Sequence, residues 1–149
     1  MRHLRQHIII SIILSVLLLN GCSKGTNPEG STAIPTVSVN VTGNINSSPY
    51  TPLLTVGGVV YINGGYRGIL LYRSTSTAIM AFDRACTYDL SNPNGIVTAQ
   101  SSGATGLCID CGSTYSLLNG DLLSGPSTMG IQSYPTTFNT STGLFTVKN

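Results

Sequence analysis

Both histidines of the chain, His3 and His7, lie at the extreme N-terminus, in a segment with the pattern of a cleavable leader. The chain that remains after such a leader contains no histidine. This absence excludes Ser-His-Asp and Cys-His catalysis, histidine-ligated zinc and any acid–base step by an imidazole.

Charged side chains are also scarce, at 8% of the sequence. Beyond the leader the five basic residues are balanced by five acidic ones, namely Lys24, Arg67, Arg73, Arg84 and Lys148 against Glu29, Asp83, Asp89, Asp110 and Asp121. There is no basic patch interleaved with aromatic residues and no glycine-rich phosphate loop after a strand. We therefore expect no nucleic-acid partner.

The first 21 residues predict an export signal. Arg2 and Arg5 precede an apolar run over residues 8–19, and Gly21 stands directly before Cys22. This order resembles the bacterial lipoprotein signal, which implies cleavage before Cys22 and lipid on its sulfur. The apolar run is shorter than the roughly 20 residues that span a bilayer. We expect a lipid-anchored protein of the bacterial cell envelope, attached to a membrane and facing the periplasm.

Residues 22–35 are small and polar, which predicts a flexible tether. Residues 36–149 then carry short runs of β-branched and aromatic residues separated by turn clusters. No stretch there keeps apolar residues at the helical period of about 3.6 for three turns. The pattern predicts an all-β domain, a sandwich or small barrel, with strands within 36–41, 57–64, 68–74 and 78–84.

The same runs predict the hydrophobic core. Its expected members are Val59, Tyr61, Ile69, Leu71, Ile79, Phe82, Phe138, Leu144, Phe145 and Val147. The Ser, Thr, Asn and Gly content predicts a surface with few charges. Asp83 and Arg84, which are adjacent in sequence, suggest a local ion pair.

The cysteines are the main candidates for chemistry. If Cys22 carries lipid, three remain: Cys86, Cys108 and Cys111. Disulfides consume cysteines in pairs, so either one thiol stays free or the three act together.

Two stretches carry a family resemblance: AFDRACTYD (81–89) and LCIDCGSTYSLLNGDLLSGPS (107–127). They resemble the two loops of a Rieske [2Fe–2S] domain, which read Cys-x-His and Cys-x-x-His-Gly-Ser at two hairpin tips. The resemblance covers roughly residues 36–149. It implies a Rieske-like fold of small antiparallel sheets with a two-loop cluster-binding subdomain, and a bound [2Fe–2S] cluster.

The sequence departs from the family at both histidine positions, which hold Tyr88 and Cys111. The resemblance implies that Cys86 and Cys108 bind the buried iron. Cys111 would bind the outer iron, with a Tyr88 phenolate or an Asp89 carboxylate as a further ligand.

Ser113 and Tyr115 stand at family positions whose hydroxyls hydrogen-bond the cluster sulfurs. The resemblance implies one-electron transfer to a redox protein partner rather than catalysis by this chain. Anionic ligands in place of imidazoles predict a potential lowered toward about −400 mV, without proton-coupled chemistry.

Three other interpretations stay open. A disulfide, either Cys108–Cys111 or Cys86–Cys111, would give a cluster-free structural or binding module. The three cysteines with Asp89 would form a zinc site, although only one Cys-x-x-Cys pair is present. Cys108 and Cys111 would form a thioredoxin-like redox pair, although the residues that follow predict a strand rather than a helix.

Overall fold

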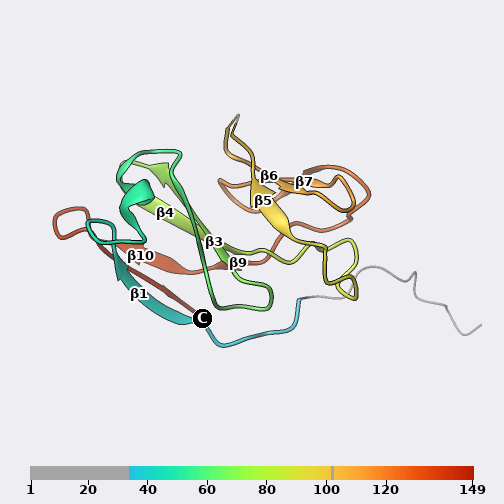
Figure 1. Cartoon of the computed structure of the whole chain (residues 1–149), viewed down its shortest axis with the longest axis horizontal. Helices are drawn as coiled ribbons and strands as arrows, with labels where there is room; N and C mark the ends of the chain where they lie inside the picture. Colours follow the sequence, from blue (N-terminus) through green and yellow to red (C-terminus); the bar gives the residue numbers. More distant parts are fainter. Residues whose placement is uncertain (1–33, 102) are drawn as a thin grey trace, which may run out of the picture.

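The chain is built almost entirely from short β-strands in the computed structural model, which describes residues 34–101 and 103–149 (Figure 1). The strands are β1 (Asn40–Asn44), β2 (Val59–Ile62), β3 (Ile69–Thr75), β4 (Ala78–Asp83), β5 (Val97–Ala99), β6 (Thr105–Cys108), β7 (Thr114–Ser116), β8 (Leu122–Ser124), β9 (Ser133–Tyr134), β10 (Thr136–Phe138) and β11 (Leu144–Lys148). One 3₁₀ helix spans Thr51–Leu54. The all-β prediction is confirmed, whereas the predicted signal peptide, Cys22 and most of the tether lie outside the described residues.

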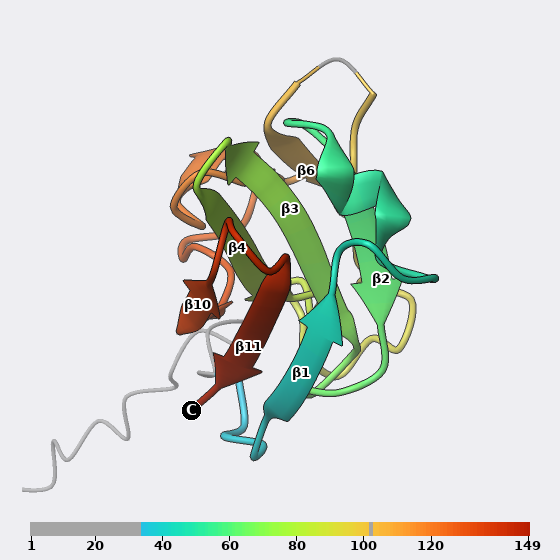
Figure 2. The ribbon, with the colours of Figure 1, turned by 90° about the vertical axis from the view of Figure 1, so that its left-hand side faces the viewer.

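The strands form three antiparallel sheets, with orders β1-β11-β10, β2-β3-β4-β9 and β5-β6-β7-β8. Figure 2 shows β1, β10 and β11 in front of β2, β3 and β4. The third sheet lies at the other end of the molecule, beyond β4 (Figure 1). No helix among the described residues is long and apolar enough to cross a membrane.

The sheet β2-β3-β4-β9 is the central layer, because side chains on both of its faces are buried. On β3, Ile69 and Leu71 belong to one hydrophobic core, whereas Leu70 and Tyr72 belong to a second core. Alternate residues of a strand point to opposite faces of its sheet. A strand covered on both faces therefore needs the continuous apolar run that the sequence shows at this point.

The two cores contain most of the predicted residues. Tyr61 and Leu144 are exceptions, with 42% and 46% of their surface exposed. Leu144 alternates with the buried Phe145 on β11 and so points outward. The Arg84 guanidinium carbon lies 4.3 Å from the centroid of the Tyr61 ring. The Tyr61 hydroxyl accepts a hydrogen bond from Ala99 N–H. The first strand also begins later than predicted, at Asn40.

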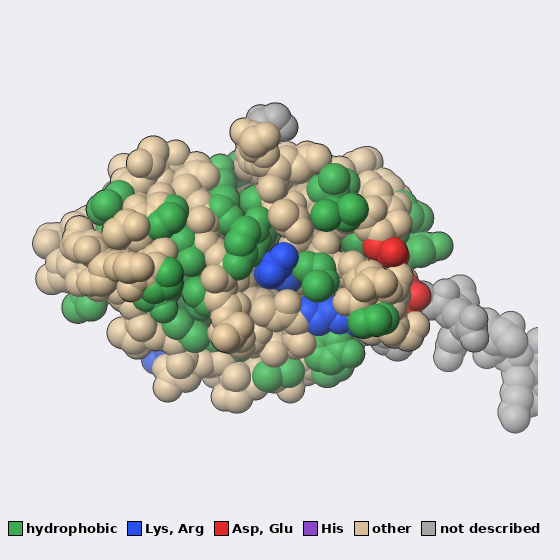
Figure 3. Space-filling view, viewed as in Figure 1, with side chains coloured by type: hydrophobic (Ala, Val, Ile, Leu, Met, Phe, Trp, Pro, Cys, Tyr) green, Lys and Arg blue, Asp and Glu red, His purple; other side chains and the backbone are tan. Residues whose placement is uncertain are grey.

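The surface matches the expectation of few charges on the face seen in Figure 3. Uncharged polar atoms and backbone cover most of that face. The acidic atoms in view lie at the end that carries the third sheet.

Asp83, the last residue of β4, is completely buried. Its carboxylate accepts hydrogen bonds from the backbone N–H groups of Tyr66 (2.5 Å), Arg67 (3.2 Å) and Ala85 (2.8 Å), and from the Tyr134 hydroxyl (2.7 Å). Burial and the nearby Asp83 raise the pKa of Tyr134. The carboxylate thus joins the β2–β3 loop to the start of the β4–β5 loop.

The prediction of an ion pair between Asp83 and Arg84 is wrong. Arg84 donates its Nε to the Val97 carbonyl at 3.1 Å and stacks on Tyr61. Backbone N–H groups occupy the Asp83 carboxylate instead. Successive residues at a strand end point to opposite sides, which separates the two charges.

We expect Asp83→Asn to lower the free energy of unfolding by about 2–3 kcal/mol, because the amide nitrogen cannot accept the buried N–H groups. Urea unfolding followed by circular dichroism measures the change. Asp121→Asn, on an exposed loop, is the matched control and changes the free energy by at most about 0.5 kcal/mol. Equal unfolding midpoints for the two variants would contradict the role of Asp83.

Candidate metal centre

The first cysteine loop joins the central sheet to β5. Ala85 pairs with Ile96 in an isolated bridge, and Cys86 N–H donates to the Gly95 carbonyl at 2.9 Å. These contacts close the loop at its base. Cys86 therefore lies just inside the closed end, with 1% of its surface exposed.

Arg67, from the β2–β3 loop, fixes the shape of the first cysteine loop. Its Nη1 donates to the carbonyls of Asn92 and Gly95, the latter at 3.2 Å, and its Nη2 donates to the Leu90 carbonyl at 2.6 Å. A guanidinium presents several donors in a fixed planar arrangement. One side chain can therefore hold three carbonyls of a loop that has no strand of its own.

The second cysteine loop is the tip of the β6–β7 hairpin. Cys108 ends β6, and two 2.9 Å bonds close the turn, from Cys108 N–H to the Ser113 carbonyl and from Gly112 N–H to the Cys108 carbonyl. Gly112 has φ = +76°, which favours glycine. The strand predicted after Cys111 is confirmed as β7. The Cys-x-x-Cys pair thus does not open a helix, which removes the support for a thioredoxin-like pair.

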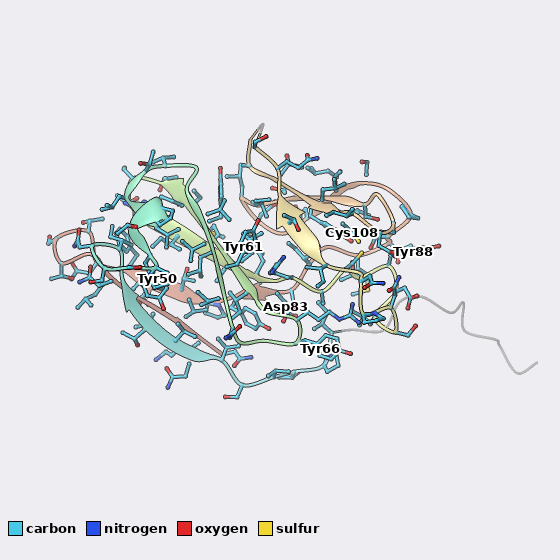
Figure 4. All side chains as sticks on the ribbon, viewed as in Figure 1. Tyr50, Tyr61, Tyr66, Asp83, Tyr88 and Cys108 are labelled. Carbon is cyan, nitrogen blue, oxygen red and sulfur yellow. The ribbon has the colours of Figure 1, made fainter. Side chains whose placement is uncertain are left out.

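The two loops bring three cysteines together. The Sγ atoms of Cys86, Cys108 and Cys111 all lie within 4.8 Å of one another, and those of Cys86 and Cys111 are 3.3 Å apart. Cys86 and Cys108 are buried, while Cys111 is partly exposed. Figure 4 shows Cys108 in the part of the molecule that carries β5 to β7.

These separations suit a metal ion. A tetrahedral ion with metal–sulfur bonds of about 2.3 Å holds its sulfur ligands about 3.8 Å apart. The three sulfurs thus form one group that could hold a metal. A two-iron cluster additionally requires Cys111 to reach a second iron and requires a fourth ligand.

Two hydroxyls lie beside the sulfurs, at the positions singled out in the sequence. The Cys111 thiol donates to Ser113 Oγ at 3.2 Å, and Ser113 N–H donates to Cys111 Sγ at 3.5 Å. The hydroxyl of Tyr115, a fully buried residue, lies 3.4 Å from Cys86 Sγ. In the thiolate or metal-bound form, both hydroxyls are placed to donate to sulfur.

A polar network behind the sulfurs was not predicted from the sequence. Thr87 Oγ1 lies 3.2 Å from the Tyr115 hydroxyl and 2.7 Å from Ser127 Oγ, and it donates to the Met129 carbonyl at 2.8 Å. Ser127 N–H donates to Ser113 Oγ at 3.0 Å. The segment around Ser127 therefore orients both hydroxyls that touch the cysteines. Its one sequence signal was the Gly125-Pro126 pair.

Of the two candidates for a fourth ligand, Asp89 is not part of the cysteine group and Tyr88 is a surface residue. Tyr88 is 43% exposed and lies at the edge of the molecule in Figure 4. Asp89 Oδ1 accepts bonds from Ser91 N–H at 2.9 Å and from Ser91 Oγ at 2.6 Å. These bonds, with the side-chain bond the largest, lower the pKa of Asp89. Asp89 therefore caps a turn in this structure.

The thiols of Cys108 and Cys111 differ in acidity. Burial, followed by the hydrogen bond with Cys86, raises the pKa of Cys108 to about 12. The pKa of Cys111 lies below its ordinary value. Burial acts to raise this pKa, but hydrogen bonds with Ser113 and the two neighbouring cysteines outweigh the effect of burial. Burial and Cys86 raise the pKa of Tyr115. Three neighbouring thiolates, two of them buried, thus require a cation to form together.

Comparison with known proteins adds no family assignment. The chain matches no protein-family model and no curated protein. The function of the centre must therefore be argued from its own residues.

Arg67→Lys should loosen the first cysteine loop, because an ammonium group cannot hold three separated carbonyls. Losing two bonds of about 1 kcal/mol each should speed hydrogen exchange at the amides of Cys86 and Gly95 at least roughly tenfold. Exchange measured by mass spectrometry tests this expectation. Arg84→Lys is the control and should leave the exchange of Gly95 unchanged; equal effects of both changes would contradict the assignment.

Proposed function

We propose that this domain is a one-electron carrier whose redox centre is a [2Fe–2S] cluster bound by Cys86, Cys108 and Cys111. The observation that carries the proposal is the convergence of three sulfurs, from two separate loops, within 4.8 Å. Thiolates are the usual ligands of such clusters. When bound, the cluster takes up and releases one electron at a time.

The arrangement of the sheets supports a Rieske-like architecture. The second cysteine loop belongs to a small antiparallel sheet, β5-β6-β7-β8, and the first loop leads directly into that sheet. The resemblance implies a subdomain of this kind, in which two hairpin tips meet over one site. The first two sheets then serve as the base that holds it.

The donor set supplies three of the four ligands that the cluster needs. Cys86 and Cys108, both buried, would hold the inner iron, and Cys111, partly exposed, the outer iron. Asp89 is not part of the cysteine group and Tyr88 is 43% exposed, so neither is assigned the fourth position. Sulfur donors favour iron–sulfur clusters over oxygen-seeking ions such as Mg²⁺.

The surrounding hydroxyls would adjust the potential. Donors from Ser113 and Tyr115 stabilise negative charge on sulfur and thus favour the reduced state. No histidine lies beyond His7, so no imidazole couples a proton to the electron. The domain then exchanges electrons alone, which suits a carrier that serves a redox protein partner.

The predicted leader supports a location for this carrier at a membrane. Lipid on Cys22 would hold the domain at a membrane of the bacterial envelope, facing the periplasm. A redox partner would approach the side of Cys111, because that cysteine is the least buried of the three.

A cluster-free module explains fewer of the contacts. One disulfide would use two sulfurs and leave the third cysteine without a role. The network of Thr87, Ser127 and Tyr115 is built toward the sulfurs and has its closest analogue in donors that surround a metal-bound thiolate.

The full chain, expressed in a bacterium and purified without air, should contain about two irons and two sulfides per molecule. Cys86→Ser, Cys108→Ser and Cys111→Ser should each lose most of the iron, whereas Tyr88→Phe and Asp89→Asn should retain it. Metal analysis and visible absorption measure both. One iron without sulfide would replace the cluster by a single-iron centre, and zinc or no metal would overturn the electron carrier.

Tyr115→Phe should lower the reduction potential of the loaded protein, because it removes one donor to sulfur. A hydrogen bond of about 1 kcal/mol corresponds to about 40 mV for one electron. Protein-film voltammetry measures the shift. Ser124→Ala is the control, since its hydroxyl contacts Thr114 at 2.8 Å and no cysteine; a potential unchanged in Tyr115→Phe would exclude the tyrosine from the redox centre.

A further inference from the structure

Two of the three sulfurs are positioned for a reaction with each other. Cys86 Sγ and Cys111 Sγ are 3.3 Å apart, although the residues are 25 positions apart and belong to different loops. A disulfide bond is about 2.05 Å long, so the sulfurs need to approach by only about 1.3 Å. The remaining gap is thus shorter than one carbon–sulfur bond.

We propose that Cys86 and Cys111 form a reversible disulfide when the centre holds no metal, and that this bond prevents metal binding. The claim that the disulfide prevents metal binding rests on the proposed function, since it concerns the same ligands. The claim that the disulfide forms depends only on the metal-free chain.

The solvent exposure of each cysteine determines which sulfur reacts first with an oxidant. Cys111 is partly exposed, whereas Cys86 and Cys108 are 1% and 0% exposed. A small disulfide such as oxidised glutathione therefore meets Cys111. The Cys111 sulfur attacks one glutathione sulfur, the glutathione S–S bond breaks, and one molecule of glutathione leaves as a thiol.

Cys86 completes the reaction. Its sulfur attacks Cys111 Sγ, the mixed disulfide breaks, and the second glutathione leaves as a thiol. Cys86 and Cys111 have then lost two electrons, which the two glutathione thiols carry with the two protons. Cys108 keeps its thiol because Cys86 Sγ lies in contact with Cys111 Sγ at 3.3 Å and reacts first.

The product cannot hold the metal as before. A sulfur in a disulfide is no longer a thiolate, so two of the three ligands are removed together. Reduction by a dithiol restores them. The centre would thus respond to oxidising conditions by closing its own metal site and cross-linking the two loops that form it.

The sequence permits a direct assignment of the bond. A protease that cleaves before aspartate cuts at Asp83, Asp89, Asp110 and Asp121, which places Cys86 in peptide 83–88, Cys108 in 89–109 and Cys111 in 110–120. Cys22 falls in the peptide that ends at Phe82. The full chain is stripped of metal with a chelator and dithiothreitol, freed of both, treated with oxidised glutathione, alkylated and digested without reduction.

Mass spectrometry should find peptide 83–88 joined to 110–120, with Cys108 alkylated. Cys108→Ser should form the same bond, and Cys86→Ser should leave Cys111 as a glutathione adduct. A link between 89–109 and 110–120, or no link, would overturn the inference. Because this assay uses metal-free protein, its failure is distinguishable from a failure to bind iron.

A separate measurement tests whether the disulfide and a bound metal exclude each other. Chain loaded with iron should form the bond at least tenfold more slowly than the metal-free chain, and the oxidised chain should take up no iron until dithiothreitol is added. Equal oxidation rates with and without iron would overturn the exclusion.

Discussion

The buried carboxylate of Asp83 is the contact on which the position of the centre depends. It gathers backbone N–H groups from the β2–β3 loop and from Ala85, at the entrance to the first cysteine loop. This fixes the loop that carries Arg67, whose guanidinium then holds the carbonyls of the first cysteine loop. Gly65 permits the close approach, since a Cβ there would lie 2.4 Å from Asp83 Oδ2. Cys86 is thus placed by a chain of contacts that begins at one buried charge.

The second constraint is electrostatic. Three sulfurs within 4.8 Å cannot all be thiolates in a buried site without a compensating charge, and burial raises the pKa of Cys108 to about 12. Hydroxyls from Ser113 and Tyr115 stabilise part of this charge but not all of it. A bound metal ion would supply the rest, and oxidation of two sulfurs would remove the need for it. Metal binding and disulfide formation are therefore two solutions to the same problem of charge.

Sequence patterns predicted the sheets well because strand periodicity reports directly on burial. The apolar runs over 57–64 and 68–74 indicated buried or half-buried strands, and the family resemblance implied two loops that carry the cysteines. The sequence patterns gave wrong predictions where a side chain has an unexpected partner. Tyr61, predicted in the core, contacts Arg84 at the surface, and Asp83, predicted to pair with Arg84, binds backbone N–H groups. Thr87 and Ser127 were missed because they are 40 positions apart and of common polar types, so only their meeting in space marks them. Tyr88 and Asp89 were proposed as ligands from their place in the family's first loop; Tyr88 is 43% exposed, and Asp89 is bonded to Ser91.

A metal site built from thiols differs from one built from imidazoles in what happens when the metal leaves. An imidazole ligand exchanges a proton and returns to a neutral ring when the metal leaves. A thiolate ligand that loses its metal is a nucleophile, and here its nearest reaction partner is a second sulfur 3.3 Å away. The absence of histidine, which removes proton-coupled chemistry from this centre, thereby introduces thiol chemistry. Under the two proposals made above, the domain would exchange electrons singly at a bound metal and in pairs at its own sulfurs. A bound metal would prevent the second reaction, because it would occupy the sulfurs that this reaction requires.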